Sequence, residues 1–342
     1  MVETAHKNGV KTVMTTSLES DVPVGYFSWS EYDFMKPLEE RKDFDIAAFI
    51  SNCGAVNFRL EAMKTLSSLG LEIDSYGNCL NNKRSEGKSK LEILSNYKFY
   101  CAFENSNEPD YVTEKFLHAL VSGSVPIYIG APNIADFEPQ ENSVIHIATL
   151  EEVPKAAEKI KYLLSNESAF TEMLAWKKQG PSSKFLALVD MAVVHSSCRL
   201  CIHVATDIRL KEYDANDRPF KCQDPKTKSR VYEVRFRERG KFEFFKVFFE
   251  VPSARTKSKG RHLERLKDLF IESLMEVDYS AIWDGHRVDF LKSVNDPIIY
   301  RIYPVGTNQK SALYGPGQIS NDKELLEYLK KTRVPMLEII LI

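Results

Sequence analysis

The segment FENSNEPDYVTEKFLHALVSGSVPIYIGAPN, residues 103–133, concentrates side chains that suit a ligand with both phosphate and sugar groups. Lys115 supplies a mobile positive charge for a phosphate, Glu114 can accept hydrogen bonds from sugar hydroxyls, and Tyr111 adds a ring and a hydroxyl. Glutamate and lysine are also common surface residues in a first helical turn, and no glycine-rich phosphate loop accompanies them. The segment therefore indicates a phosphate- and sugar-binding site, with an ordinary helix surface as the alternative.

The neighbouring residues predict where these side chains lie. The apolar run KFYCAF, residues 98–103, suits a buried parallel strand, and the polar loop after it contains Asn105 and Ser106. That loop then lies at the carboxyl end of the strand, where open α/β sheets bind ligands. Asp110 is a good N-cap for a helix that begins at Tyr111, and the free N–H groups and dipole of a helix start favour phosphate. One apolar face of this helix should pack on the sheet: Val112, Phe116, Ala119 and Leu120.

The chain as a whole is predicted to be α/β, with a doubly wound parallel sheet and a separate α+β extension. Strand and helix patterns alternate from residue 46 to about residue 180. Beyond them, residues 232–252 are typical of a hairpin, 263–277 of a helix and 336–342 of a terminal strand. We therefore expect three parts: an N-terminal piece with a linker (1–42), the sheet domain (43–205) and the extension (206–342).

Composition excludes several classes of protein. The formal net charge of the 342 residues is -2, so no global charge directs the chain to nucleic acid or to an anionic membrane. No stretch approaches the roughly 20 apolar residues of a membrane span. Residues 1–14 lack the apolar core of a signal peptide. The sequence predicts a soluble globular chain without a targeting segment.

Cysteines point to an oxidising compartment. Cys198 and Cys201 form a CxxC pair, and Cys222 follows at a distance; we expect a disulfide among these three. Zinc is the second interpretation, because His195 and His203 flank the pair, although the spacing matches no standard finger. Asn166 begins an N-x-S/T triplet and is a candidate glycosylation site.

Residues 103–133 closely resemble the signature of the α1,3/1,4-fucosyltransferases, which transfer L-fucose from GDP-fucose. The resemblance extends to AAFISNCGAVNFRLEAMKTL (47–66) and LEIDSYGNC (71–79), a strand–helix–strand unit of the donor domain. FLALVDMAVVHSSCRLC (185–201) and RIYPVGTNQKSALYG (301–315) resemble the plant-type enzymes that add α1,3-fucose to the Asn-linked GlcNAc of N-glycans. The family would make GDP-fucose the donor and an N-glycan glycoprotein the acceptor.

This resemblance implies a GT-B-like, two-Rossmann-domain enzyme that inverts the configuration at fucose. Residues 1–42 would be a remnant of its acceptor-binding domain with a linker, and residues 43–205 its GDP-fucose-binding domain. It places Arg59 at the diphosphate and Tyr76 near the nucleotide; without it, Arg59 would be taken for a helix-surface arginine. Arg59, Lys115 and the helix start would stabilise the leaving diphosphate, so no cofactor and no metal is expected. Asp43 and Asp45 spell a DxD, but they lie in a charged linker and are expected to be solvated.

The general base is the part of the family pattern that this sequence does not match. In the family it is a glutamate upstream of the stretch that here reads SDVPVGYFSW (20–29), and the chain is expected to begin too late to contain it. Glu19 is interpreted as a surface residue, and no catalytic residue is assigned. By family the protein belongs to the Golgi lumen, held there by an N-terminal membrane anchor that is expected to be missing here. The alternatives are a GDP-sugar-binding chain without turnover and a transferase that uses a UDP-sugar.

Overall fold

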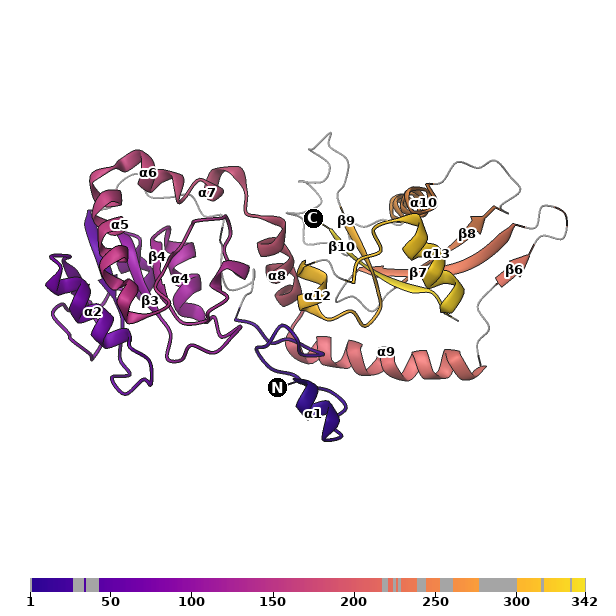
Figure 1. Cartoon of the computed structure of the whole chain (residues 1–342), viewed down its shortest axis with the longest axis horizontal. Helices are drawn as coiled ribbons and strands as arrows, with labels where there is room; N and C mark the ends of the chain where they lie inside the picture. Colours follow the sequence, from indigo (N-terminus) through magenta and orange to yellow (C-terminus); the bar gives the residue numbers. More distant parts are fainter. Residues whose placement is uncertain are drawn as a thin grey trace. The chain divides into compact units, whose positions relative to one another are not determined.

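The computed structural model of the chain describes residues 2–26, 34, 43–216, 221–223, 226, 229–238, 244–252, 261–276, 300–314, 317–332 and 334–341. These residues form two compact units (Figure 1). The sheet unit consists of Thr15–Leu18 and Pro23–Val193. The C-terminal unit consists of Met1–Met14, Glu19–Val22 and Val194–Ile342. The predicted boundary between residues 205 and 206 falls inside a continuous helix, α9 (Ser196–Asn216), so the division lies earlier in the chain than expected.

The sheet unit contains a five-stranded, all-parallel sheet. Its strands are β1 (Phe44–Ala48), β2 (Ile73–Ser75), β3 (Tyr97–Phe103), β4 (Val125–Ile129) and β5 (Ile145–His146). Their order is β2-β1-β3-β4-β5, and every neighbouring pair is parallel. The α/β class and the doubly wound sheet are confirmed. In this order the connections reverse direction between β1 and β3, which makes the carboxyl ends of these two strands the topological switch point.

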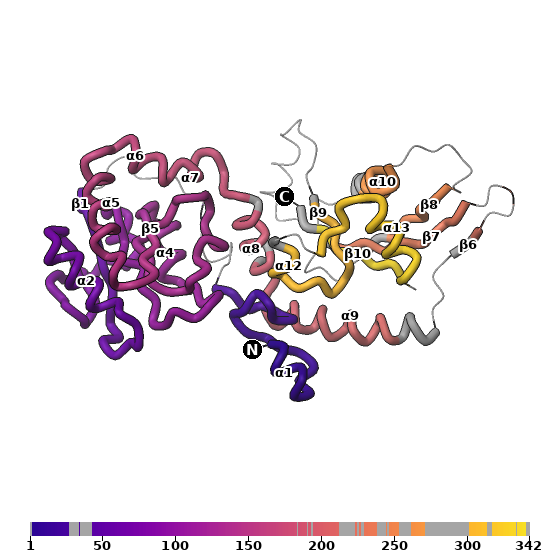
Figure 2. The backbone as a smooth tube through the Cα atoms, viewed as in Figure 1, coloured from indigo at the N-terminus to yellow at the C-terminus, as the bar shows by residue number. Residues whose placement is uncertain are grey.

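Helices cover both faces of this sheet (Figures 1 and 2). On one face α2 (Arg59–Ser68) and α5 (Val153–Ser165) pack in a core of Ile, Val, Ala and Leu side chains. On the other face α4 (Glu114–Ser122) contacts β3 and β4, and α3 (Lys90–Leu94) lies beside α4. The predicted burial is confirmed: Phe116, Ala119 and Leu120 of α4 are buried, and so is Val112, which precedes the helix. The shorter helices of the unit are η1 (Ile134–Asp136), η2 (Leu150–Glu152), α6 (Glu167–Glu172), α7 (Trp176–Gln179) and α8 (Ser183–Val193).

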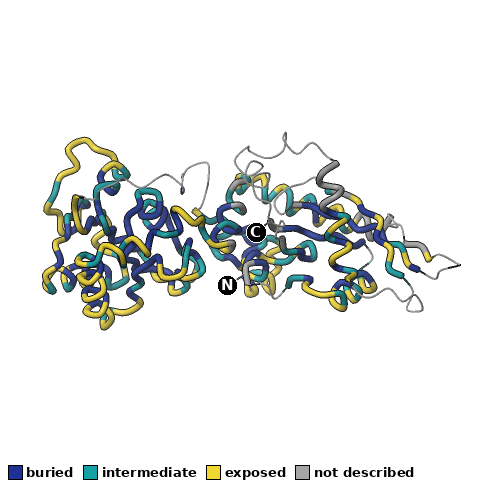
Figure 3. Tube along the Cα trace, turned by 90° about the horizontal axis from the view of Figure 1, so that it is seen from above, coloured by how far each residue is buried: buried dark blue, intermediate teal, exposed yellow. Residues whose placement is uncertain are grey.

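The C-terminal unit is α+β, as predicted. Its strands are β6 (Lys221–Gln223), β7 (Arg230–Glu238), β8 (Phe245–Val251), β9 (Tyr300–Pro304) and β10 (Met336–Leu341). The strands β7 and β8 form the expected antiparallel hairpin, and the chain ends with β10, which pairs parallel with β7 and antiparallel with β9. Its helices are α1 (Val2–Lys7), α9, α10 (His262–Glu276), α12 (Gln309–Tyr314) and α13 (Asp322–Lys331). Figure 3 shows a buried centre in each unit beneath exposed helices and loops. Among the described helices, none is both long enough and apolar enough to cross a membrane.

Candidate functional site

Polar loops gather where β1 and β3 end, at the switch point of the sheet. The loop after β1 and the loop after β2 approach each other closely at Gly77. A Cβ atom added to Gly77 would lie 2.2 Å from the carbonyl oxygen of Ile50, so only glycine fits there. The loop after β3 begins with Glu104, whose N–H donates to the carbonyl of Ile129 on β4 at 2.7 Å. The edge of the sheet is therefore a set of loops that hold one another in place.

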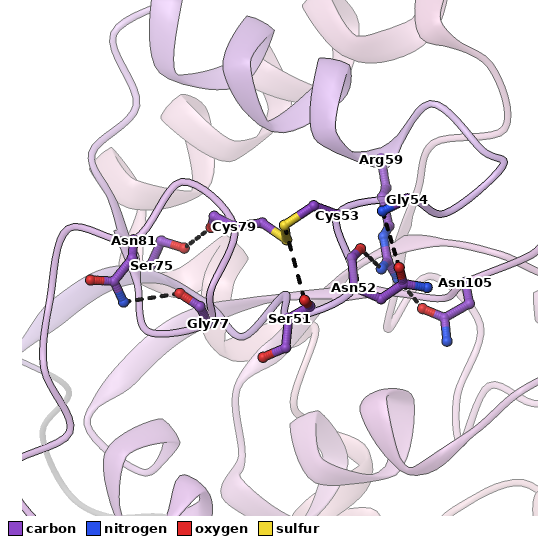
Figure 4. Close-up of a disulfide and its surroundings, with 10 residues drawn as sticks. All are labelled: Ser51, Asn52, Cys53, Gly54, Arg59, Ser75, Gly77, Cys79, Asn81 and Asn105. Atoms are coloured by element: carbon purple, nitrogen blue, oxygen red, sulfur yellow. Dashed lines mark hydrogen bonds between the residues drawn. A yellow bond between two sulfur atoms is a disulfide. The ribbon is translucent and has the colours of Figure 1, made fainter.

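Arg59 ties two of these loops together from the first position of α2 (Figure 4). Its Nη1 donates to the carbonyl oxygens of Phe103 and Glu104 at 3.2 and 2.9 Å and to Asn105 Oδ1 at 2.6 Å. Its Nη2 donates to the carbonyl of Asn52, and the residue is only 2% exposed. Burial lowers the pKa of this guanidinium, against the opposing effect of Glu104. Arg59 is thus a buried clamp and not a surface arginine; its contact with a diphosphate stays a prediction.

A disulfide between Cys53 and Cys79 joins the loops after β1 and β2 (Figure 4). It crosslinks residues 26 apart in sequence, with a Cα–Cα distance of 5.6 Å. The predicted pairing differs: Cys198 and Cys201 are free thiols at exposed positions of α9, and Cys222 lies in β6 with a side chain outside the described residues. The prediction followed the sequence spacing, whereas a disulfide requires two cysteines that the fold brings within bonding distance.

The structure also differs from the expected start of the helix after β3. That helix, α4, begins at Glu114, and its N-cap is Thr113, whose Oγ1 accepts from the N–H of Lys115. Asp110, the predicted N-cap, has φ 64° and lies in a turn. Its carboxylate accepts instead from Ser17 Oγ and from the N–H of Leu18, at 3.2 and 3.0 Å. Tyr111 therefore precedes the helix, while Glu114 and Lys115 do occupy its first turn.

Below this turn lies Glu104, a fully buried carboxylate that the sequence analysis missed. It accepts hydrogen bonds from the N–H and Oγ1 of Thr113, at 2.8 and 2.7 Å, and lies 3.3 Å from Lys115 Nζ. Burial raises the pKa of Glu104, although Lys115 and Thr113 oppose this effect. The signal for this residue was its place, the first polar position after a buried strand.

Lys115 lies between two carboxylates. Its Nζ is 3.3 Å from Glu104 and 3.1 Å from Glu114, and its side chain is 17% exposed. Burial disfavours the ammonium, but the two carboxylates outweigh it and raise the pKa of Lys115. Lys115 in turn outweighs burial at Glu114 and holds the pKa of that carboxyl below its usual value. The first turn of α4 therefore carries one cation and, nearby, two acidic groups.

An aromatic cluster occupies the β2 side of the edge. The ring of Tyr76, which follows β2, stacks on Phe49 after β1 with centroids 4.9 Å apart and an interplanar angle of 12°. The hydroxyl of Tyr76 lies 2.7 Å from that of Tyr97, which donates to Asp74. Tyr76 is partly exposed, and its place near a nucleotide stays a prediction.

The other predicted residues near the edge are Asn105, Ser106 and Tyr111. Asn105 accepts from Arg59, and Ser106, next to it, is partly exposed. Burial raises the pKa of the Tyr111 hydroxyl. The carbonyl of Tyr111 accepts from Tyr128 Oη at 3.4 Å. The fold therefore brings Asn105, Ser106, Tyr111, Glu114 and Lys115 to one stretch of loop and helix start.

Lys90, the first residue of α3, is a further cation at this edge that the sequence analysis missed. It is partly buried, and its Nζ lies 5.0 Å from the ring centroid of Tyr100 and 5.6 Å from that of Phe49. Burial lowers the pKa of Lys90 to about 8. No pattern in the sequence marks this lysine, because its neighbours come from three separate segments.

The remaining predicted residues make contacts of other kinds. Glu19 is 49% exposed and forms an ion pair with Lys310 at 2.7 Å, as expected for a surface residue. Asn166 caps α6: its Oδ1 accepts from the N–H of Ala169, and its Nδ2 donates to Tyr162 Oη, each at 3.0 Å. Asp43 and Asp45 are exposed, as expected, but Asp45 lies within β1 and not in a linker. In the described part of the chain, no cluster of three or more His, Cys, Asp or Glu could hold a metal ion.

Comparisons with known proteins identify the family of the chain. The family model described as "Glycosyltransferase family 10 (fucosyltransferase) C-term" matches residues 39–216. A fucosyltransferase-like protein of Arabidopsis thaliana is 48% identical over 91% of this chain and 60% of its own length. Glycoprotein 3-alpha-L-fucosyltransferase A of Drosophila melanogaster is 31% identical over 60% of this chain, and GDP-fucose protein O-fucosyltransferase 3 of Homo sapiens is 31% identical over 45%. The chain spans 41% and 39% of the length of these two proteins. A crystal structure of an alpha1,3-fucosyltransferase with GDP-fucose aligns at 31% identity and a TM-score of 0.34, covering 42% of this chain and 40% of that one.

Proposed function

The chain belongs to glycosyltransferase family 10, and on that premise we propose that it binds GDP-fucose at the carboxyl edge of its parallel sheet and serves in the transfer of L-fucose to an acceptor hydroxyl. One observation carries the proposal. The family match, residues 39–216, contains all five strands of the sheet and the polar edge with Arg59, Glu104 and Lys115.

The charges at this edge suit a sugar nucleotide. The leaving GDP gains negative charge as the bond to fucose breaks, and a cation placed there lowers the barrier. Lys115 remains an ammonium because Glu104 and Glu114 raise its pKa. Glu114 remains ionised and can accept hydrogen bonds from sugar hydroxyls. Arg59 acts by positioning, since it fixes the loops after β1 and β3. We propose that this transfer uses no metal ion. Added EDTA should therefore leave the rate of fucose transfer unchanged.

We further propose the acceptor to be the Asn-linked GlcNAc of an N-glycan, fucosylated at its 3-hydroxyl in the Golgi lumen with inversion at the fucose carbon. Two observations support this choice: the resemblance of residues 301–315 to the plant-type enzymes and the similarity to a glycoprotein 3-alpha-L-fucosyltransferase. A side-chain hydroxyl of a folded protein is the second candidate acceptor, because a protein O-fucosyltransferase is also 31% identical, over 45% of this chain. A chain that binds GDP-fucose without turnover is the alternative to both, since no described residue is assigned as the general base.

Binding and transfer are tested separately. Calorimetry with the 342-residue chain should show binding of GDP and much weaker binding of UDP; equal affinity for both would contradict the assignment of the donor. Transfer is measured with GDP-fucose on a glycopeptide that ends in GlcNAc and, in parallel, on a folded protein domain without glycans. Fucose on the glycopeptide supports the N-glycan acceptor, fucose on the bare domain supports the second candidate, and binding of GDP without either product supports the alternative without turnover.

A further inference from the structure

Contacts of the main chain hold Glu104 at the end of β3. Its N–H donates to the carbonyl of Ile129 at the end of β4, at 2.7 Å. Its own carbonyl oxygen accepts from Arg59 Nη1 at 2.9 Å and from Asn57 Nδ2 at 3.0 Å. Three segments therefore fix this position: the end of β4, the loop after β1 and the start of α2.

The side chain of Glu104 passes close to Gly130, the first residue after β4. A Cβ atom at Gly130 would lie 2.6 Å from Glu104 Cγ and 2.5 Å from Tyr128 Oη, so glycine leaves the room that this glutamate needs. Glu104 is completely buried. Burial of a carboxylate costs much free energy unless donors compensate it, so its partners must be specific.

Thr113 compensates this burial and also connects Glu104 to Lys115. Its N–H and its hydroxyl donate to the carboxylate at 2.8 and 2.7 Å. A hydroxyl has a single hydrogen, which this bond uses, so its lone pairs can only accept. Lys115 supplies the donors, with its Nζ at 2.9 Å and its N–H at 3.4 Å from Thr113 Oγ1. The contacts thus fix the direction of each hydrogen bond in this network.

Lys115 is the most exposed member of the network. Glu104 and Thr113 are 0% and 1% exposed, whereas the side chain of Lys115 is 17% exposed. Its Nζ lies 2.9 Å from Thr113 Oγ1, 3.3 Å from Glu104 and 3.1 Å from Glu114. A lysine side chain is flexible and loses entropy when a ligand fixes it. Here the protein fixes the ammonium beforehand, and such preorganisation increases affinity.

The carboxylate of Glu104 does not cancel the attraction of Lys115 for an anion. A phosphate oxygen in contact with the exposed side of Nζ would be nearer to this atom than to the buried carboxylate, and Coulomb energy falls with distance. The attraction therefore exceeds the repulsion. Burial by itself lowers the pKa of Lys115, and Glu104 is the largest charge that opposes this effect. The same carboxylate thus fixes the ammonium and helps to keep its proton.

We propose that Glu104 and Thr113 are positioning residues of the donor site. They hold the Lys115 ammonium where the diphosphate of the sugar nucleotide binds, and they do not contact the nucleotide themselves. This inference rests on the proposed function, in which Lys115 stabilises the leaving diphosphate. Loss of the Thr113 hydroxyl should then weaken nucleotide binding only in a protein that still carries Lys115.

The first test is a double-mutant cycle on GDP binding by the 342-residue chain, measured by calorimetry. Thr113→Val keeps the shape of the side chain and removes the hydroxyl; it should weaken GDP binding by about 10-fold. Thr113→Ser keeps the hydroxyl and should stay within about 3-fold of the parent. Lys115→Met should weaken GDP binding by about 10- to 100-fold. Thr113→Val added to Lys115→Met should cause no further loss.

A purely structural role of Thr113 predicts a different result. A threonine that only caps α4 would lower GDP affinity by the same factor with and without the Lys115 ammonium. Thr171→Val, at an exposed position of α6, is the matched control for loss of a hydroxyl and should bind GDP like the parent. Hydrogen exchange of peptides from β3 and β4 verifies that each variant retains the folded sheet unit.

A pH series on Glu104→Gln tests the other positioning residue. In the parent the pKa of Lys115 is raised, so the ammonium persists in mildly alkaline solution. Without the Glu104 carboxylate this pKa should decrease, because burial disfavours the ammonium and one of its two neighbouring carboxylates is gone. The groups that face Lys115, besides Glu104, are Glu114 and His118 on α4, Lys90 on α3 and Tyr111 just before α4.

The control for this series is Glu108→Gln, which removes an exposed carboxylate from the same loop. From pH 7.5 to pH 9.5, the GDP affinity of Glu104→Gln should fall by about 3-fold or more relative to that of Glu108→Gln, because Lys115 loses its proton. Ionisation of GDP itself affects both variants alike. Parallel curves of the two variants would refute the role of Glu104.

The outcomes separate this inference from the proposed function. If the parent does not bind GDP, the donor assignment is wrong and the inference fails with it. If the parent binds GDP and Thr113→Val or Lys115→Met binds it equally well, the positioning role is refuted while binding of GDP stands. An equal effect of Thr113→Val in the presence and absence of Lys115 also refutes it. A loss confined to the protein that carries Lys115 supports it.

Discussion

Removal of the Cys53–Cys79 disulfide should destabilise the sheet unit by a predictable amount. The crosslink joins residues 26 apart and therefore restricts a loop of about that length in the unfolded chain. The chain-entropy relation assigns such a loop a stabilisation of about 3.5 kcal/mol at 25 °C. The loops that it joins also carry Arg59 and Tyr76, so we expect the double variant Cys53→Ala/Cys79→Ala to bind GDP more weakly as well.

The assay must report on the sheet unit alone, because the chain contains two compact units. Hydrogen exchange of peptides from β1 and β3, followed by mass spectrometry across a urea series, gives the free energy of unfolding of that unit. The control is Cys198→Ala/Cys201→Ala, which removes two exposed thiols of α9 and should change nothing. An oxidised parent no more stable than the double variant would refute the reasoning, and so would a peptide map that pairs Cys198 with Cys201.

Three further predictions concern the same unit. Arg59→Ala should lower the free energy of unfolding by about 3 kcal/mol or more, because buried carbonyls lose their donor. Lys64→Ala, on the exposed face of α2, should leave it nearly unchanged in the same urea titration. Burial raises the pKa of Glu138 to about 7, so the folded chain keeps a proton there that the unfolded chain loses near pH 4.5. The free energy of unfolding should therefore fall as the pH rises between these values. Glu138→Gln should abolish this pH dependence. Gly77→Ala should destabilise the unit by about 1–3 kcal/mol, because the new Cβ would meet the backbone after β1. Gly54→Ala should be tolerated, because a Cβ there would lie 3.7 Å from its nearest neighbour. Similar melting temperatures of the two variants would contradict the packing argument.

Local pattern was sufficient for the elements of the site. The buried run that became β3 and the helical spacing of Val112, Phe116 and Leu120 predicted a strand, a polar loop and a helix in the right order. Periodicity succeeds here because it depends on burial of one face, which a short segment already encodes. The same pattern predicted Glu114 and Lys115 near the start of that helix, although it began the helix at Tyr111, three residues too early.

The local rule for helix N-caps failed at Asp110, because distant segments bind the same carboxylate. Asp110 has a side chain that caps helices well, but Ser17, Leu18 and Asn133 bind its carboxylate, and Thr113 became the cap instead. Nothing within a few residues of Asp110 indicates those partners. The tertiary contacts outweighed a preference worth about 1 kcal/mol.

The sequence by itself determined the class of the fold, the family and the stretch of loop and helix that carries Glu114 and Lys115, because each of these is written in residues close together in the chain. Only the tertiary structure decided that Cys53 pairs with Cys79, that Arg59 is buried as a clamp and that Lys90 lies over the switch point. Each of those outcomes joins groups from separate strands and helices. The physical reason is that burial and charge pairing depend on distances in space. The crossover connections of a parallel sheet determine those distances, and the spacing of residues along the chain does not.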